Sequence, residues 1–179
     1  MLWVAYFAIH SILASGRVKK ALGEPSWYRL FYVFISIATL VPVFIYGLGI
    51  ESKYLFQISV ATKIPSVGLG YAAYFIFRKA AKSYNLKAFI GVAKETRSEL
   101  KTDGILSKMR HPFYTATIAI VLGFFLWSPT VSNLVLVLTW IAYLPIGIWL
   151  EEKKLIDLFG DAYLDYKKQV PALFPRSFK

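Results

Sequence analysis

The chain has 179 residues, 57% of them hydrophobic and 17% aromatic, and its mean hydropathy is +0.53. Soluble globular domains are usually about half apolar, so this composition excludes that class and predicts a chain that lies in a lipid bilayer. The absence of cysteine excludes disulfides, thiolate metal sites and a cysteine nucleophile, and with only His10 and His111 available we expect no metal centre. The net charge of +11 comes from lysines and arginines that flank apolar runs, so we expect no nucleic-acid partner.

Five apolar segments are candidate membrane spans, because a helix that crosses a bilayer needs about 20 mostly apolar residues. In chain order they cover residues 2–14, 27–50, 64–77, 113–127 and 131–150. The second contains Pro42, which we expect to kink it, and the third contains Gly68 and Gly70, which would let a neighbouring helix approach closely. Residues 51–63 are too polar for lipid and predict an outer loop or an interfacial segment. Only Ser128-Pro129-Thr130 separates the last two spans, which predicts a tight helical hairpin.

The residues after the hairpin are charged and amphipathic. Four apolar residues are expected on one side of a helix that ends at Gly160; they are Leu155, Ile156, Leu158 and Phe159. Asp161 can cap a second short helix, which Pro171 stops.

The distribution of lysine and arginine predicts the orientation of the spans. Of the 21 basic residues, 19 fall on the segments that five spans place on one side, and Lys53 and Lys63 fall on the other. We therefore expect an all-α integral membrane protein with five transmembrane helices, its N-terminus outside and its C-terminus in the cytoplasm, followed by cytoplasmic amphipathic helices. It would form one membrane domain with three spans (1–77), a cytoplasmic connection (78–111), a helical hairpin (112–150) and a tail (151–179).

Polar residues gather at the two cytoplasmic ends of this hairpin. Arg110, His111 and Tyr114 precede or begin the fourth span and would face Glu151 and Glu152 at the end of the fifth. Ionisable residues at such a depth usually pair or bind a ligand. Each also has a structural explanation, since Arg110 could snorkel to the interface, His111 could cap a helix, and the two glutamates could begin an interfacial helix.

A histidine in the first predicted span is the remaining ionisable candidate. His10 is a functional-site hypothesis by default, as a contact to substrate, and a hydrogen bond to Ser11 or to a neighbouring helix explains it equally well.

Two motifs on either side of the hairpin carry a resemblance to a known family. The runs are Leu100-Lys101-Thr102-Asp103-Gly104-Ile105-Leu106 with Arg110-His111-Pro112-Phe113-Tyr114, and Glu151-Glu152, Leu155, Phe159-Gly160, Tyr163, Tyr166, Val170-Pro171 and Pro175. Together they resemble the signature of the isoprenylcysteine carboxyl methyltransferase superfamily, which includes phospholipid N-methyltransferases and small-thiol S-methyltransferases. The family's Pro-Tyr after the glycine is replaced here by Ile105-Leu106.

The N-terminal half is similar to the bacterial small-thiol branch of that superfamily. The residues that carry this similarity are Trp3, His10-Ser11-Ile12-Leu13-Ala14-Ser15, Tyr28-Arg29-Leu30-Phe31-Tyr32, Tyr84-Asn85-Leu86 and Phe89-Ile90-Gly91. The resemblance places the chain in a prokaryotic cytoplasmic membrane, with its site facing the cytoplasm.

The resemblance implies an enzyme that binds S-adenosylmethionine between the last two spans and the C-terminal tail, and releases S-adenosylhomocysteine. No glycine-rich strand-to-helix fingerprint of a Rossmann fold is present in the sequence. Position by position, the residues implied to contact the cofactor are Leu100, Lys101, His111, Pro112, Phe113, Tyr114 and Glu151.

These residue types suit the cofactor's chemistry. Glu151 can bind the ammonium or the ribose hydroxyls, and the ring of Tyr114, Tyr163 or Trp149 can attract the sulfonium by about 0.5–2 kcal/mol. Pro112 suits the first position of a helix, where N–H groups can bind the methionine carboxylate. Trp149 and His10 are also candidate contacts for the methyl acceptor.

Methyl transfer is an in-line displacement, so the protein mainly aligns the reactants and excludes water. Arg110 and Glu152 are the candidate catalytic residues: Arg110 could hold a substrate carboxylate or thiolate, or pair with Glu152 as structural support. We expect a small or lipid-borne acceptor, a thiol or an isoprenylcysteine-like carboxylate, with a phospholipid amine as the second choice. A non-enzymatic transporter or assembly factor is the competing hypothesis of a different class, and a protein that binds cofactor without turnover is a third.

Overall fold

The structure is a computed structural model and describes residues 2–23, 25, 27–84, 90, 92 and 99–175. Within these residues it is all-helical, with seven α-helices, one short 3-10 helix and a single isolated β-bridge. The chain divides into two compact units, one holding the chain up to Lys53 and the other holding Tyr54–Tyr84 and the described residues from 99 onward. The all-α prediction is therefore confirmed. The motif residues Asn85, Leu86, Phe89 and Gly91 lie outside the described residues.

The first unit contains α1 (Leu2–Ala14), α2 (Gly16–Ala21) and α3 (Tyr28–Gly49). The predicted first two spans therefore correspond to α1 and α3, and α3 continues through Pro42. The hydroxyl of Tyr28 is buried and donates to the Leu13 carbonyl at 2.7 Å, which joins the end of α1 to the start of α3.

The second unit contains α4 (Val60–Ser83), the 3-10 helix η1 (Gly104–Ser107), α6 (Pro112–Trp127), α7 (Val131–Phe159) and α8 (Asp161–Gln169). Helix α4 is longer than the predicted third span, so the expected loop over residues 51–63 is wrong at its end. The reason is a capping box in which Ser59 and Thr62 satisfy each other's backbone N–H groups.

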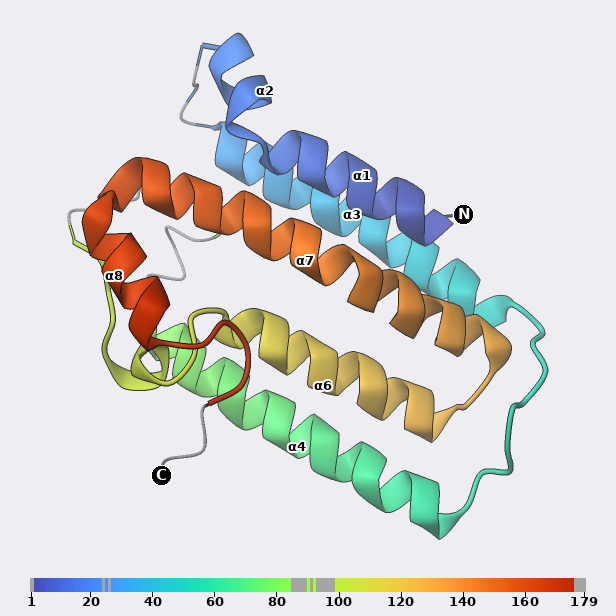
Figure 1. Cartoon of the computed structure of the whole chain (residues 1–179). Helices are drawn as coiled ribbons and strands as arrows, with labels where there is room; N and C mark the ends of the chain where they lie inside the picture. The colour runs from blue at the N-terminus through green and yellow to red at the C-terminus, as the bar shows by residue number, and fades with distance from the viewer. Residues whose placement is uncertain are drawn as a thin grey trace. The chain divides into compact units, whose positions relative to one another are not determined.

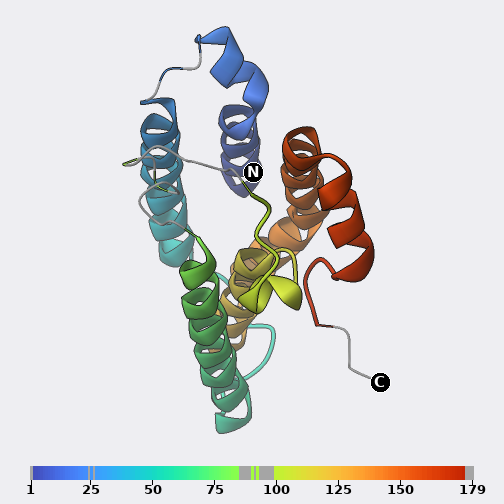
Figure 2. The same ribbon diagram turned by 90° about the vertical axis from the view of Figure 1, so that its left-hand side faces the viewer.

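Helices α4 and α6 pack closely along their length (Figures 1 and 2). Ala73 of α4 meets Ala116 and Ala119 of α6, and the Ser66 hydroxyl donates to the Gly123 carbonyl at 2.6 Å. A Cβ built on Gly123 would lie 3.1 Å from the Ser66 carbonyl oxygen. Small side chains thus bring the two backbones together, as in membrane helix pairs.

The glycines that make this approach differ from those predicted. A Cβ built on Gly68 or Gly70 meets no described atom within 4 Å, so neither position requires glycine to accommodate a neighbour. Within the second unit, α6 approaches the face of α4 that carries Ser66 and Ala73, with the Gly70 backbone N 3.8 Å from a Cβ built on Gly123, so the glycine that this contact requires is on the partner helix.

The predicted hairpin of α6 and α7 is confirmed, with Thr130 capping α7 by accepting from the Asn133 N–H at 3.2 Å. Helix α7 runs without a break past Leu150 to Phe159, so the fifth span and the first amphipathic helix are one element. It ends at Gly160, as predicted, where φ is +56°. Gly160 is also the residue that precedes α8, so Asp161 is the first helical residue and not the cap.

Among the described residues, three helices are long and apolar enough to cross a membrane: α3, α4 and α7. Helices α1 and α6 are apolar but shorter, with 13 and 16 residues. All five carry large hydrophobic side chains that are exposed, as a lipid-facing surface requires.

Candidate functional site

The site is centred on a buried ion pair between Arg110, which precedes α6, and Glu152 of α7. The Arg110 Nη2 and Nε atoms donate to Glu152 Oε1 at 2.6 and 3.0 Å, and both side chains are less than a tenth exposed. The third guanidinium nitrogen, Nη1, donates to the backbone carbonyls of Lys167 and Val170. Arg110 therefore ties the start of α6 to α7 and to the end of α8.

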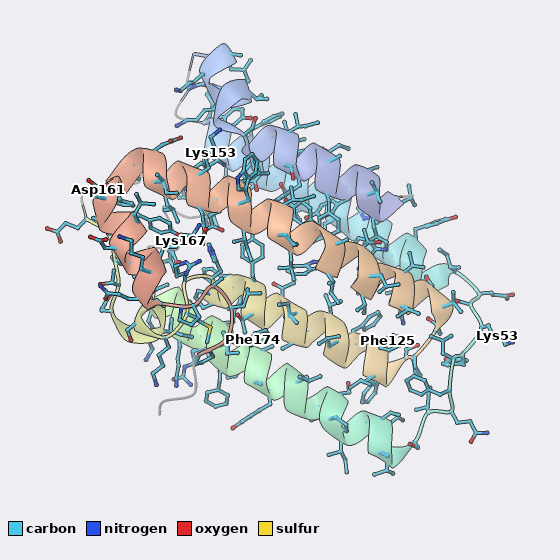
Figure 3. All side chains as sticks on the ribbon, in the orientation of Figure 1. Lys53, Phe125, Lys153, Asp161, Lys167 and Phe174 are labelled. Carbon is cyan, nitrogen blue, oxygen red and sulfur yellow. The ribbon has the colours of Figure 1, made fainter. Side chains whose placement is uncertain are left out.

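Among the described residues, Glu152 accepts from three side chains. Besides Arg110, Lys167 of α8 approaches its Oε2 at 2.5 Å, and the buried His111 ring places Nε2 at 3.2 Å from Oε1. Two permanent cations thus surround one carboxylate, which offsets the cost of burying its charge. In Figure 3, Lys167 projects from α8 into the space between α8 and α6.

His111 lies between the two glutamates of α7. Its Nδ1 atom is 3.5 Å from Glu151 Oε2, on the opposite side of the ring from Glu152. The His111 backbone occupies the N-cap position of α6, but its side chain makes no capping hydrogen bond. Each ring nitrogen of His111 therefore faces a carboxylate, Nδ1 that of Glu151 and Nε2 that of Glu152.

The C-terminal tail closes over the start of α6. The backbone N–H groups of Arg110 and His111 donate to the carbonyls of Pro171 and Ala172, each at 2.9 Å. The Thr115 hydroxyl donates to the Leu173 carbonyl at 2.7 Å. The two halves of the signature, far apart in sequence, meet here through main-chain hydrogen bonds.

Beneath this closure lies an aromatic layer from α8. Tyr163, Tyr166 and Val170 form a buried cluster, and Leu100 packs against it. The Tyr166 hydroxyl donates to the Leu106 carbonyl at 2.6 Å. The Tyr163 hydroxyl has no hydrogen-bond partner among the described residues. Burial raises the pKa of Tyr166 to about 12 and raises that of Tyr163 further, so both phenols are neutral at physiological pH.

The structure shows what replaces the family's Pro-Tyr after Gly104. The side chains of Ile105 and Leu106 are buried and pack with Met109 against Ala80 of α4. Gly104 has a φ of +60°, a backbone conformation that favours glycine and lets η1 turn back toward α4. The departure from the family pattern therefore supplies apolar packing between α4 and the site.

Of the predicted cofactor contacts, Glu151 and Tyr114 lie beside His111. The Glu151 side chain is 46% exposed, in contrast to Glu152 at 7%. The Tyr114 ring meets the His111 ring edge-on at 5.7 Å between centroids, and its hydroxyl lies close to Gly147 of α7. A Cβ on Gly147 would be 2.9 Å from that hydroxyl, so Gly147 makes room for Tyr114.

The remaining predicted residues fall at different distances from this cluster. Pro112 is fully buried as the first residue of α6, and the Phe113 ring meets Phe77 edge-on and Tyr84 at a tilt on the α4 side. Lys101 lines a cavity next to η1. Trp149 is 60% exposed, and the Lys153 ammonium lies 5.7 Å from its ring centroid.

His10 belongs to the first unit. Its Nδ1 lies 3.1 Å from the Ser36 hydroxyl, and its Nε2 lies 2.9 Å from the Tyr32 hydroxyl, which links α1 to α3. This arrangement matches the interhelical hydrogen bond that the sequence left open, with Ser36 and Tyr32 as partners on α3.

Sequence reasoning missed Lys167, Thr115 and the carbonyl of Val170. Lys167 follows the signature tyrosine Tyr166 by one position, and the available signal for a second cation was that two adjacent glutamates face a single motif arginine. Within the described residues, no group of three or more histidines and acids is arranged to hold a metal ion.

The groups around His111 fit the polar groups of S-adenosylmethionine. Glu151 offers an accessible carboxylate for an ammonium or for hydroxyl groups, because Arg110 and Lys167 are both engaged by Glu152. Tyr114 supplies an aromatic ring on the same side. Glu152 and Tyr163 are buried and form the support behind these groups.

The fold and the site together define a class: an all-helical protein with apolar helices of membrane-crossing length, whose last hairpin and tail enclose a buried ion cluster. The chain belongs to the NnrU protein family, whose model matches residues 1–173. No solved structure matches the chain.

Curated relatives are named as methyltransferases. Methanethiol S-methyltransferase 1 of Bradyrhizobium diazoefficiens is 29% identical over 196 aligned residues, covering 98% of this chain and 65% of that protein. A methanethiol S-methyltransferase of Pseudomonas deceptionensis is 36% identical over 88 residues, covering 46% of this chain and 31% of that protein. The protein-S-isoprenylcysteine O-methyltransferase of Schizosaccharomyces pombe is 36% identical over 84 residues, covering 42% and 33%.

These relatives confirm the predicted resemblance to the isoprenylcysteine carboxyl methyltransferase superfamily and its small-thiol branch. The chain spans 65% of the length of the Bradyrhizobium relative and about a third of the other two.

Proposed function

We propose that this chain is an S-adenosylmethionine-dependent membrane methyltransferase whose acceptor is a small thiol. The observation that carries the proposal is the meeting of the two signature halves. The Arg110-His111 segment is joined to the Pro171-Ala172 segment by main-chain hydrogen bonds, around a buried Glu152. The near full-length similarity to a protein named methanethiol S-methyltransferase supports the thiol as acceptor.

In this proposal, Glu151 binds the ammonium or the ribose hydroxyls of the cofactor. Its side chain is the more exposed of the two glutamates and lies next to His111, which orients it. Tyr114 presents its ring to the sulfonium, whose methyl group is the electrophile that the bound cofactor supplies. Attraction between the cation and the ring is worth about 0.5–2 kcal/mol. Pro112, Phe113, Leu100 and Lys101 complete the predicted contacts.

We assign Arg110 and Glu152 a positioning role. All three guanidinium nitrogens of Arg110 already donate to Glu152 or to backbone carbonyls, which favours structural support over contact with a substrate. The pair fixes His111 and, through it, Glu151. Misplacement of such groups by about 1 Å can slow a reaction by about a hundredfold.

The acceptor would approach from the bilayer or from the cytoplasmic interface. A thiol must be deprotonated to attack, and methyl transfer from the sulfonium needs in-line alignment and exclusion of water. Trp149, exposed on α7 next to the glutamates, is the proposed contact for an apolar acceptor. His10 remains a proposed substrate contact from the first unit.

We further propose five transmembrane spans with the N-terminus outside and the C-terminus in the cytoplasm of a prokaryotic cell. The positions of the basic residues support this topology, since 19 of 21 fall on the cytoplasmic side. Helices α3, α4 and α7 have the necessary length; α6 rises about 24 Å at 1.5 Å per residue, which requires local thinning of a hydrocarbon core of about 30 Å.

The test of the activity is methyl transfer by the purified, reconstituted chain from S-adenosylmethionine labelled in its methyl group. We expect labelled thioether from methanethiol and none from a phospholipid amine. Product from an isoprenylated cysteine and not from methanethiol would move the acceptor to the carboxylate class. Folded protein that yields no labelled product from either acceptor would contradict the proposed activity.

A further inference from the structure

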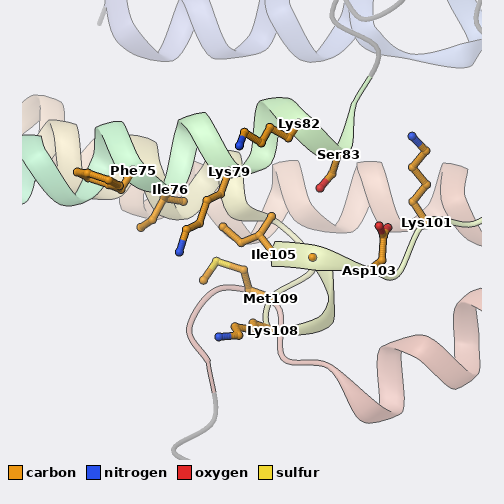
Figure 4. A pocket seen from close by; sticks show the side chains of 11 residues that line it. Phe75, Ile76, Lys79, Lys82, Ser83, Lys101, Asp103, Ile105, Lys108 and Met109 are labelled. Carbon is orange, nitrogen blue, oxygen red and sulfur yellow. The ribbon is translucent and has the colours of Figure 1, made fainter.

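A cavity lies in the second unit between the C-terminal end of α4 and the η1 segment (Figure 4). Its volume is about 650 Å³, and its walls come from α4 on one side and residues 101–109 on the other. Such a volume is in the range of small-molecule sites.

The rim of this cavity is strongly basic. Among the residues that the structure describes, four lysines line it, Lys79 and Lys82 from α4 with Lys101 and Lys108 from the opposite wall, against the single acid Asp103. None of the four ammonium groups forms an ion pair with a residue that the structure describes. Figure 4 shows Lys79 and Lys108 reaching toward the same end of the cavity from its two walls. An uncompensated group of cations of this kind attracts an anion.

The floor of the cavity is apolar. Ile105 and Met109 are buried there, and Ile76 and Phe75 belong to α4. Phe75 also continues into an exposed apolar face of α4 that includes Tyr71, at 66% exposed, and Val67, at 61%. The cationic rim, the apolar floor and the apolar face of α4 together suit a molecule with an anionic head and a hydrocarbon chain.

This cavity lies on the opposite side of η1 from the Arg110–Glu152 cluster. Of the predicted cofactor contacts, Lys101 lines the cavity and Phe113 packs on the cluster that forms its floor, whereas His111, Tyr114 and Glu151 do not line it. The side chains of Ile105 and Met109 face the cavity and α4, whereas the neighbouring Leu106 carbonyl accepts from Tyr166 of α8. The η1 segment therefore divides the two, with the Arg110–Glu152 cluster on the α8 side.

We propose that this cavity binds one anionic phospholipid, with the phosphate held by Lys79 and Lys108 and an acyl chain lying along the exposed face of α4. Basic pockets beside membrane helices recognise anionic headgroups in this way. In this proposal the lysines recognise the phosphate alone. A zwitterionic lipid is therefore bound more weakly, because the positive charge of its own headgroup neutralises its phosphate.

The test is a titration of the full chain in detergent with dioctanoyl phosphatidylglycerol below its micellar concentration. Lys79→Gln with Lys108→Gln is the cavity variant, and Lys19→Gln with Lys20→Gln, on exposed positions of α2, is the control that removes the same charge. We expect the cavity variant to bind about tenfold or more weakly than wild type, and the control to bind like wild type. Equal binding by the two variants, or no binding by wild type, overturns the proposal.

Two further titrations identify the source of the phosphate. Dioctanoyl phosphatidylcholine is expected to bind at least about tenfold more weakly than the glycerol lipid, and millimolar inorganic phosphate is expected not to displace the lipid. Equal binding of phosphatidylcholine, or displacement by free phosphate, contradicts a lipid site. No cofactor or methyl acceptor is present, so the outcome is independent of the proposed methyl transfer.

Discussion

Glu152 is the residue on which the charges of the site converge. Its carboxylate is 7% exposed and accepts from Arg110, His111 and Lys167, which come from two segments on either side of α7 in the sequence. A buried ion pair adds little net stability over an apolar pair, but breaking one leaves an uncompensated charge. The site is therefore sensitive to loss of either partner.

Replacement of Glu152 by Gln should lower the stability of the chain by about 3 kcal/mol, because Arg110 would remain buried without its counter-charge. The measurement is the unfolding midpoint of the detergent-solubilised variant, followed by circular dichroism. Glu151→Gln is the matched control: its side chain is 46% exposed, so we expect a loss of less than about 1 kcal/mol. Equal losses for the two variants would show that burial of Glu152 is not what stabilises the site.

At the scale of elements, the contact between α4 and α6 determines where the site residues lie. Gly123 lets α6 approach the Ser66 carbonyl, and Phe113 at the other end of α6 packs on Phe77. Because Arg110 and His111 directly precede α6, its packing on α4 sets their position relative to α7 and α8.

Replacement of Gly123 by Ala should destabilise this helix pair. The new Cβ would lie 3.1 Å from the Ser66 carbonyl oxygen, and separating the backbones typically costs about 1–3 kcal/mol. Gly68→Ala on the open face of α4 meets no described atom within 4 Å, so it should leave stability unchanged or raise it by up to about 1 kcal/mol. Thermal unfolding of both variants in the same detergent is the measurement; a Gly68 variant that is the less stable of the two would refute the assigned contact face.

The sequence was sufficient to place the helices, because long apolar runs and their terminators are local features. Residues 2–14 and the turn Ser128-Pro129-Thr130 were predicted with the observed bounds, and the start of α6 within one residue. The start of α4 was missed because Lys63 and Thr62 are polar, although Ser59 and Thr62 carry the capping signal. Hydropathy could not reveal that α7 continues past Leu150, because the side chains become polar there while the helix itself continues.

The sequence predicted the candidate site only where the spacing of the motif residues along the hairpin fixed which side chains meet. The expected approach of Arg110 and His111 to the two glutamates is observed. The contact face of α4 could not be derived from composition, because Gly68, Gly70 and Ser66 are all small and only packing distinguishes them. Lys167 and Thr115 could not be placed because their partners lie about 15 and 58 residues away in sequence.

At the scale of the whole molecule, the proposed five-span topology depends on α6, which has 16 residues. The absence of native cysteine makes single-cysteine labelling direct. In intact cells, a membrane-impermeant maleimide should label Ser52→Cys and Ser128→Cys, while Ser107→Cys should be labelled only after permeabilisation. If Ser128→Cys is labelled on the same side as Ser107→Cys, α6 does not cross the membrane and the proposed topology is wrong.

The most direct test of the central claim is calorimetric binding of S-adenosylmethionine and S-adenosylhomocysteine to the purified chain in detergent. We predict micromolar affinity for both, and a loss of about tenfold or more in Glu151→Ala, whose carboxylate is proposed to bind the cofactor's ammonium or hydroxyls. The control is Glu51→Ala, an exposed acid outside the site, which should bind like wild type. Folded wild-type protein that binds neither compound, or a Glu151 variant with unchanged affinity, would contradict the assignment of the cofactor site.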